Sequence, residues 1–172
     1  TVGVVGYGHV GSKVVRILKA FGCRILVHDP YVQLSAEDLR DGVEQVSKER
    51  ILAESDIITL HARVTDETRG FFGAAELAAM KKGAYLVNTA RGPLLDYDAL
   101  TQALKSRHLR GAAIETFGVE PVPPDWELLG LDNVTLTPHI AGASVKTVKY
   151  AAAASAEEVR RYLAGEPLLN PC

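Results

Sequence analysis

The sequence predicts an α/β fold, built as a doubly wound parallel sheet with helices on both faces in three layers. Short apolar runs rich in β-branched residues alternate along the chain with stretches whose apolar residues have helical spacing. Strands that are apolar throughout are typical of a parallel sheet covered on both faces, since such strands have no solvent side. The first run also leads directly into a glycine-rich turn that opens a helix. We therefore expect a single domain over residues 1–172, without repeats or an internal linker.

Each element follows from a local signal. The apolar runs predict strands over residues 1–6, 24–29, 43–46, 56–61, 84–88, 109–114 and 134–137. The periodic stretches predict helices over residues 10–21, 48 onward, 74–80, 98–106 and 145–165. Ser47 and Asp96 can cap two of these helices, and Ser144 opens the last, because their side chains accept hydrogen bonds from free backbone N–H groups. The proline-rich segment 117–130 is expected to be irregular, and the alanine run 151–154 is expected to allow close packing.

Composition excludes several functional classes. The net charge is −2, with 47% apolar and 23% charged residues, so nothing draws the chain to nucleic acid or an anionic membrane. No apolar run reaches membrane-spanning length and no signal peptide precedes the first strand, which favours a cytoplasmic location. Cys23 and Cys172 lack metal-ligand spacing and are expected to be free thiols, and no metal site is expected. Because the chain begins inside a strand and ends just after a helix, we expect it to be a fragment.

The glycine turn is the first candidate binding site. In Gly6-x-Gly8-x-x-Gly11, the first glycine permits the tight turn and the second lets the backbone approach a pyrophosphate. The third lets the helix pack on the strand, while the helix N-terminus stabilises phosphate. Asp29 ends the second strand, where a carboxylate accepts hydrogen bonds from the ribose hydroxyls of NAD and repels the 2′-phosphate of NADP. The alternative for Asp29 is a solvated turn residue before Pro30.

Three polar residues follow later strands and suit the reduction of a 2-keto acid. Arg91 could pair with a carboxylate through its rigid fork of donors. His139 could transfer a proton near neutral pH, and Glu120 could stabilise its imidazolium form. Each also has a simpler interpretation, respectively a surface salt bridge, a packing residue and a turn. The other histidines are weaker candidates, although His61 could border the cofactor.

Together these segments resemble the D-isomer-specific 2-hydroxyacid dehydrogenases. The likeness covers residues 1–29, 55–70, 80–92 and 132–142. The order and spacing of Arg91, Glu120 and His139 match the Arg-Glu-His set of that family. The resemblance implies a Rossmann-type NAD-binding domain and the reversible oxidation of a D-2-hydroxy acid to its 2-keto acid. It implies that Arg91 holds the substrate, that His139 is the acid in reduction and the base in oxidation, and that Glu120 orients it.

The resemblance also implies the cofactor contacts. His9 and Val10 are similar to residues whose backbone contacts the pyrophosphate. The residues implied on the nicotinamide side are Ala62, Thr89, Ala90 and Gly142. Glu115 stands where the family usually has Asp, at a position expected to bind the nicotinamide carboxamide. Arg63 stands where the family commonly has Pro, which suggests a polar or phosphorylated acid as substrate.

Several alternatives stay open at this point. Transcriptional corepressors of the same superfamily resemble the enzymes down to the Arg-Glu-His set, so an NAD-sensing binding protein is a second hypothesis. An adenosylhomocysteine hydrolase fits the sequence around Arg91, Glu120 and His139 poorly, and Glu120 argues against a formate-oxidising enzyme. The resemblance further implies a homodimer. It also implies a substrate domain that is mostly absent from these 172 residues.

Overall fold

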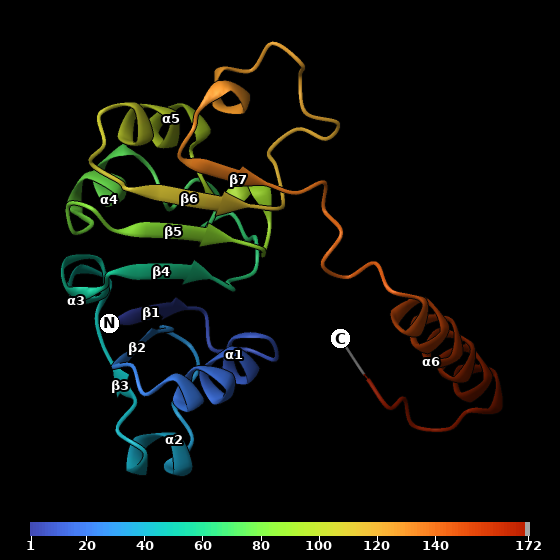
Figure 1. The fold of residues 1–172 in the computed structure, drawn as a ribbon. Coiled ribbons are helices and arrows are strands. Elements are labelled where there is room, and N and C mark those ends of the chain that lie inside the picture. Colours follow the sequence, from blue (N-terminus) through green and yellow to red (C-terminus); the bar gives the residue numbers. More distant parts are fainter. Residues whose placement is uncertain (171–172) are drawn as a thin grey trace. The chain divides into compact units, whose positions relative to one another are not determined.

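The computed structural model describes residues 1–170, and its sheet has the predicted parallel arrangement (Figure 1). Seven strands lie in the order β3-β2-β1-β4-β5-β6-β7, and every neighbouring pair is parallel. The strands are β1 (Val2–Val5), β2 (Ile25–His28), β3 (Glu44–Gln45), β4 (Ile57–Leu60), β5 (Tyr85–Asn88), β6 (Gly111–Ile114) and β7 (Val134–Leu136). All seven coincide with predicted strands, so the doubly wound α/β class is confirmed.

Helices that follow the strands cover both faces of this sheet. The helices of the chain are α1 (Gly11–Leu18), α2 (Ala36–Arg40), α3 (Lys48–Glu54), α4 (Ala74–Ala79), α5 (Tyr97–Lys105) and α6 (Val145–Ala164), with 3₁₀ turns η1 (Lys19–Phe21), η2 (Gly92–Leu94) and η3 (Glu127–Gly130). The chain winds one way from β1 to β3 and the other way from β4 onward. Because strand crossovers are right-handed, this reversal places α1 and α2 on one face and α3, α4 and α5 on the other.

Alternate residues of β2 show the two faces directly. Ile25 and Val27 pack with Val15 of α1, whereas Leu26 packs with Ile51 of α3 in a separate, larger core. All five side chains are at most 4% exposed. Strands buried on both sides explain why the runs in the sequence are apolar throughout rather than alternating.

Local capping signals predicted most helix boundaries correctly. The side chains of Ser47, Asp96 and Ser144 accept hydrogen bonds from backbone N–H groups at the starts of α3, α5 and α6, at 3.3, 3.0 and 3.0 Å. Gly165 ends α6 in the left-handed conformation, with φ 68°. Helix α2 was not predicted, although Ser35 caps it by accepting from the N–H of Asp38 at 3.0 Å. Its five residues are too few for apolar periodicity to show.

The chain divides into two compact units, Thr1–Pro138 and the part from His139 onward. The second unit consists mainly of α6 and the segment that follows it. Alanines 151–154 lie in the middle of α6, as predicted, and none of the residues of α6 is buried.

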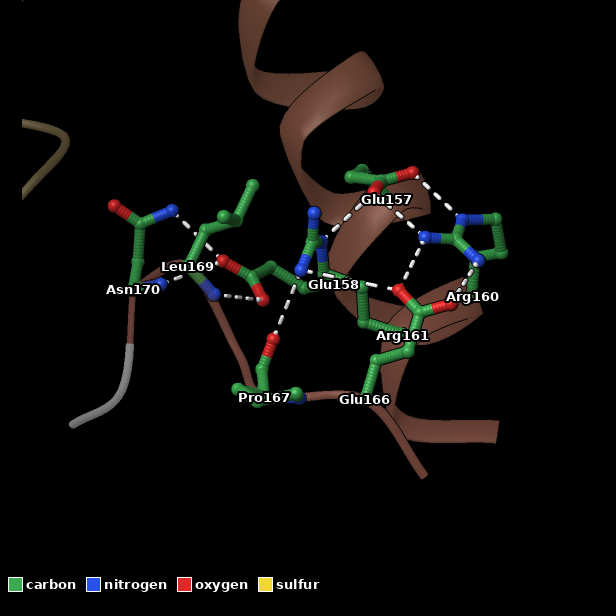
Figure 2. A network of polar contacts seen from close by, with 8 residues as sticks. All are labelled: Glu157, Glu158, Arg160, Arg161, Glu166, Pro167, Leu169 and Asn170. Carbon is green, nitrogen blue, oxygen red and sulfur yellow. Dashed lines mark hydrogen bonds and ion pairs between the residues drawn. The ribbon is translucent and has the colours of Figure 1, made fainter. Parts of the chain in front are cut away.

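Hydrogen bonds and ion pairs hold the segment that follows α6 against the last turns of that helix (Figure 2). The carboxylate of Glu158 accepts from the backbone N–H groups of Leu169 and Asn170, at 3.1 and 2.8 Å. Arg160 donates to both Glu157 and Glu166, and this contact lowers the pKa of Glu157 to about 2. Because these groups are exposed, the pairs shape the segment more than they stabilise the fold.

Candidate functional site

The glycine turn lies at the topological switch point between β1 and β4, where open α/β sheets bind ligands. Gly6 has φ 94°, and a Cβ there would lie only 2.6 Å from the backbone nitrogen of Ala62. A Cβ on Gly11 would overlap the carbonyl oxygen of Gly6, so only glycine lets α1 start this close to β1. A Cβ on Gly8 would meet no atom within 4 Å. The turn is therefore packed on its protein side and open at Gly8, as a pyrophosphate cradle requires.

Asp29 holds the glycine turn in place. One of its carboxylate oxygens accepts from the N–H of Tyr7 at 2.7 Å, and the other accepts from the N–H groups of Tyr31 and Val32 at 2.9 and 3.0 Å. A carboxylate has about four acceptor positions, so these bonds leave capacity for a ribose hydroxyl. The sequence predicted only the ribose contact of Asp29 and gave no sign of this second task of shaping the turn.

The side chain of Tyr7 links the same turn to α2. Its hydroxyl donates to Asp38 at the start of α2, and Asp38 also pairs with Lys19. Burial raises the pKa of Tyr7, so the hydroxyl keeps its proton and remains a donor. Sequence reasoning missed this contact because it joins the glycine turn to α2, which was not predicted.

A cleft of about 550 Å³ opens beside the turn at the carboxyl ends of the central strands. It is lined by Val10, His61, Ala62, Arg63, Val64, Thr89, Ala90, Arg91 and Pro93. Five residues implied by the resemblance are thereby brought together: Val10, Ala62, Thr89, Ala90 and Arg91. His9 precedes α1 and is not among the residues that line the cleft; its Nε2 is 2.8 Å from Nζ of Lys13.

His61 lines the cleft at the end of β4, where burial favours its neutral form. Its ring is partly buried, and its Nε2 lies 3.0 Å from the hydroxyl oxygen of Thr59. Burial lowers the pKa of His61 below its usual value, because the imidazolium loses hydration there. The shift acts against a positive charge on His61 in the cleft.

Asn88 shapes the loop that carries Arg91. It is fully buried at the end of β5, where its Nδ2 donates to the carbonyl oxygen of Arg91 at 3.1 Å. Its Oδ1 accepts from the N–H of Ala90, also at 3.1 Å. Both bonds bend the chain as it leaves the sheet, and the Arg91 guanidinium donates back to the carbonyl oxygen of Ala90 at 2.7 Å. Sequence reasoning did not single out Asn88, although a polar residue closing an apolar strand is visible in the sequence.

Gly92 brings the Arg91 segment into backbone contact with the turn that carries Glu120. A Cβ on Gly92 would overlap the carbonyl group of Phe117 and the nitrogen of Gly118. Glu120 closes this turn, because its Oε1 accepts from the N–H of Phe117 at 2.9 Å. The first unit thus places the segments of two predicted catalytic residues side by side.

Three predicted residues remain: Glu115 in the first unit, and His139 and Gly142 in the second. Glu115 is buried after β6, and its N–H donates to the carbonyl oxygen of Asn88 at 3.0 Å. His139 and Gly142 belong to the second unit, so their part in the site stays a prediction. His139 has a left-handed backbone with φ 50°, which is uncommon for a residue other than glycine.

Other kinds of site are not indicated in the described chain. Among residues 1–170, no group of three or more His, Cys, Asp or Glu side chains is placed to hold a metal ion. The same residues form no helix that is both long and apolar enough to cross a membrane. Cys23 is a free thiol, while Cys172 lies outside the described residues.

The switch-point turn, the acid at the end of β2 and the adjoining cleft define a dinucleotide-binding domain of the oxidoreductase type. The profile of the D-isomer specific 2-hydroxyacid dehydrogenase NAD-binding domain matches residues 1–141. The chain therefore belongs to this family and comprises its NAD-binding domain. The predicted family, fold and cofactor are confirmed, and the matches give no support to the corepressor alternative.

Named relatives agree with this assignment. A glyoxylate reductase from Korarchaeum cryptofilum is 44% identical over 168 residues, which are 96% of this chain and 50% of the relative. A D-3-phosphoglycerate dehydrogenase from Methanocaldococcus jannaschii is 42% identical over 167 residues, 96% of this chain and 32% of the relative. The chain thus spans half or less of these proteins. The crystal structure of a D-isomer specific 2-hydroxyacid dehydrogenase from Xanthobacter autotrophicus, in complex with NADPH and MES, has TM-score 0.86 and 35% identity, covering 98% of this chain and 69% of that one.

Proposed function

We propose that this chain is the cofactor-binding and catalytic half of an NAD-dependent dehydrogenase that interconverts a D-2-hydroxy acid and its 2-keto acid. The observation that carries the proposal is the cleft, which joins the glycine turn to Arg91 across the ends of β4 and β5. A phosphate site, a nicotinamide wall and a carboxylate-binding cation on one edge are what hydride transfer to a keto acid requires. Substrates named for the relatives suggest glyoxylate or a phosphorylated hydroxy acid.

The proposed mechanism assigns one task to each side chain. Arg91 pairs with the substrate carboxylate and polarises the keto group. His139 donates a proton to the carbonyl oxygen in reduction and accepts it in oxidation, with Glu120 as its orienting partner. NAD(H), when bound, would supply or accept the hydride. Glu115 and Gly142 are assigned to the nicotinamide side.

We further propose that residues 1–172 form the dinucleotide-binding domain of a longer protein, whose other residues supply the substrate domain. A cytoplasmic homodimer is the assembly we propose, on the family resemblance. The chain's share of its relatives, 50% and 32% of their lengths, supports the two-domain arrangement.

The function is tested by comparing the isolated chain with the full-length protein. Both should bind NADH, measured by titration of its fluorescence, whereas only the full-length protein should reduce members of a 2-keto acid panel. Holding reactants in place can lower a barrier by about 7–11 kcal/mol, and the isolated chain lacks one wall of the substrate site. Absence of turnover by the full-length protein with every keto acid would refute the proposal. Robust turnover by the isolated chain would show that the substrate site is misplaced.

Asp29 should decide the choice of cofactor. We expect NADH to bind the parent chain at least about tenfold more tightly than NADPH, because the carboxylate repels a 2′-phosphate. Asp29→Asn removes the charge but keeps an acceptor for Tyr7, so the NADH preference should shrink. Asp66→Asn, which removes an exposed acid outside the cleft, is the matched control. Equal binding of both cofactors by the parent would contradict the assignment of Asp29.

A further inference from the structure

Arg63 lines the cleft although the proposed mechanism gives it no task. It follows Ala62 at the end of β4, where the resemblance leads us to expect proline. Its carbonyl oxygen accepts from the hydroxyl of Thr68 at 2.6 Å, and the N–H of Thr65 donates to the same hydroxyl at 2.8 Å. These bonds fix the backbone from which the Arg63 side chain extends. In the part of the chain that the structure describes, its guanidinium makes no hydrogen bond or ion pair.

The residues that line the cleft include positive charges but no negative ones. Two arginines, Arg63 and Arg91, line it together with no Asp or Glu, and both are exposed. Burial lowers the pKa of His61 and so favours its neutral form. The Arg91 guanidinium donates to the carbonyl oxygen of Ala90, and neither arginine forms an ion pair among residues 1–170. Two like charges at one cleft are unfavourable by themselves and are stabilised by anionic groups.

The carboxylate of the proposed substrate would occupy only one of the two arginines. The proposed substrate offers a single carboxylate, which Arg91 is placed to bind. A guanidinium presents several donors in a planar fork and suits the oxygens of a phosphate group. Val10, at the start of α1, lines the same cleft, so a phosphate there would also face a helix N-terminus.

We propose that Arg63 binds a phosphate group, separate from the carboxylate held by Arg91. The group could come from the pyrophosphate of the cofactor or from a phosphorylated 2-keto acid. Both sources present phosphate oxygens to Arg63. Only the second source, the phosphorylated keto acid, rests on the proposed function. In either case the arginine extends the anion site beyond the glycine turn.

Two measurements distinguish the sources, each with Arg63→Gln and the control Arg69→Gln. Arg69 lies on the same loop, is exposed and does not line the cleft. The first measurement is the Kd of NADH for the chain at two salt concentrations. If the cofactor is the source, Arg63→Gln should raise this Kd about ten- to hundredfold and reduce its salt dependence, because a charge-assisted hydrogen bond is lost.

The second measurement is kcat/KM of the full-length protein for 3-phosphohydroxypyruvate and for hydroxypyruvate. If the substrate is the source, Arg63→Gln should lower the first value by a similar factor and leave the second unchanged. Equal behaviour of Arg63→Gln and Arg69→Gln in both measurements would overturn the proposal. Failure of the proposed function would instead appear as a parent protein that reduces no keto acid, and the NADH titration would still report on Arg63.

Discussion

Gly92→Ala is expected to destabilise the protein by about 1–3 kcal/mol or more and to weaken NADH binding. The added Cβ would overlap the backbone of Phe117 and Gly118, and backbone atoms cannot turn aside as a flexible side chain can. The segments carrying Arg91 and Glu120 must therefore separate. Because Arg91 borders the cleft, this shift also distorts the cofactor site. The midpoint of urea unfolding and the Kd of NADH measure the two effects.

Gly130→Ala is the matched control for this substitution. A Cβ on Gly130 would meet no atom within 4 Å, and Gly130 is not among the described residues with positive φ. Both variants add one methyl group to a 3₁₀ turn, η2 or η3, so their difference isolates the backbone contact at Gly92. If both variants unfold at the same urea concentration as the parent, the close approach of the two segments is not as described.

Features with a local cause were predictable from the sequence. Ser47 and Asp96 marked two helix starts, since a cap acts on N–H groups only a few residues away. Parallel strands share a carboxyl edge, so the residues that follow β1, β4 and β5 come together, and Val10, Ala62 and Arg91 line one cleft there.

Contacts between distant segments could not be predicted in this way. Asp29 bonds to the N–H of Tyr7 across 22 positions, and Gly92 meets Phe117 although α5 and β6 lie between them in the chain. Such contacts depend on how the elements pack, which no spacing along the chain encodes. The two bonds of Asn88 are local, but asparagine is also common in solvated turns at the ends of strands, so its identity alone does not reveal them.

His139→Ala in the full-length protein is expected to lower turnover by about 10²–10⁴-fold, the usual contribution of a positioned proton donor, while the Kd of NADH stays nearly unchanged. The substitution leaves the glycine turn and Asp29 unchanged. Turnover should therefore fall while the affinity for NADH is kept. His108→Ala, which removes a histidine between α5 and β6 outside the cleft, is the control and should retain turnover.

Glu120→Gln tests whether Glu120 and His139 act together. The amide oxygen can still accept from the N–H of Phe117, so the turn should be retained, but the negative charge is lost. Without that charge an imidazolium at His139 is less stable, and its neutral form persists to lower pH. In the proposed mechanism, reduction needs protonated His139. The pH above which kcat/KM for reduction falls should therefore be lower in the variant than in the parent. Oxidation needs neutral His139. The pH below which kcat/KM for oxidation falls should therefore also be lower in the variant. If neither limit moves, Glu120 is not coupled to His139, and the proposed pairing of Arg91, Glu120 and His139 in one mechanism is wrong.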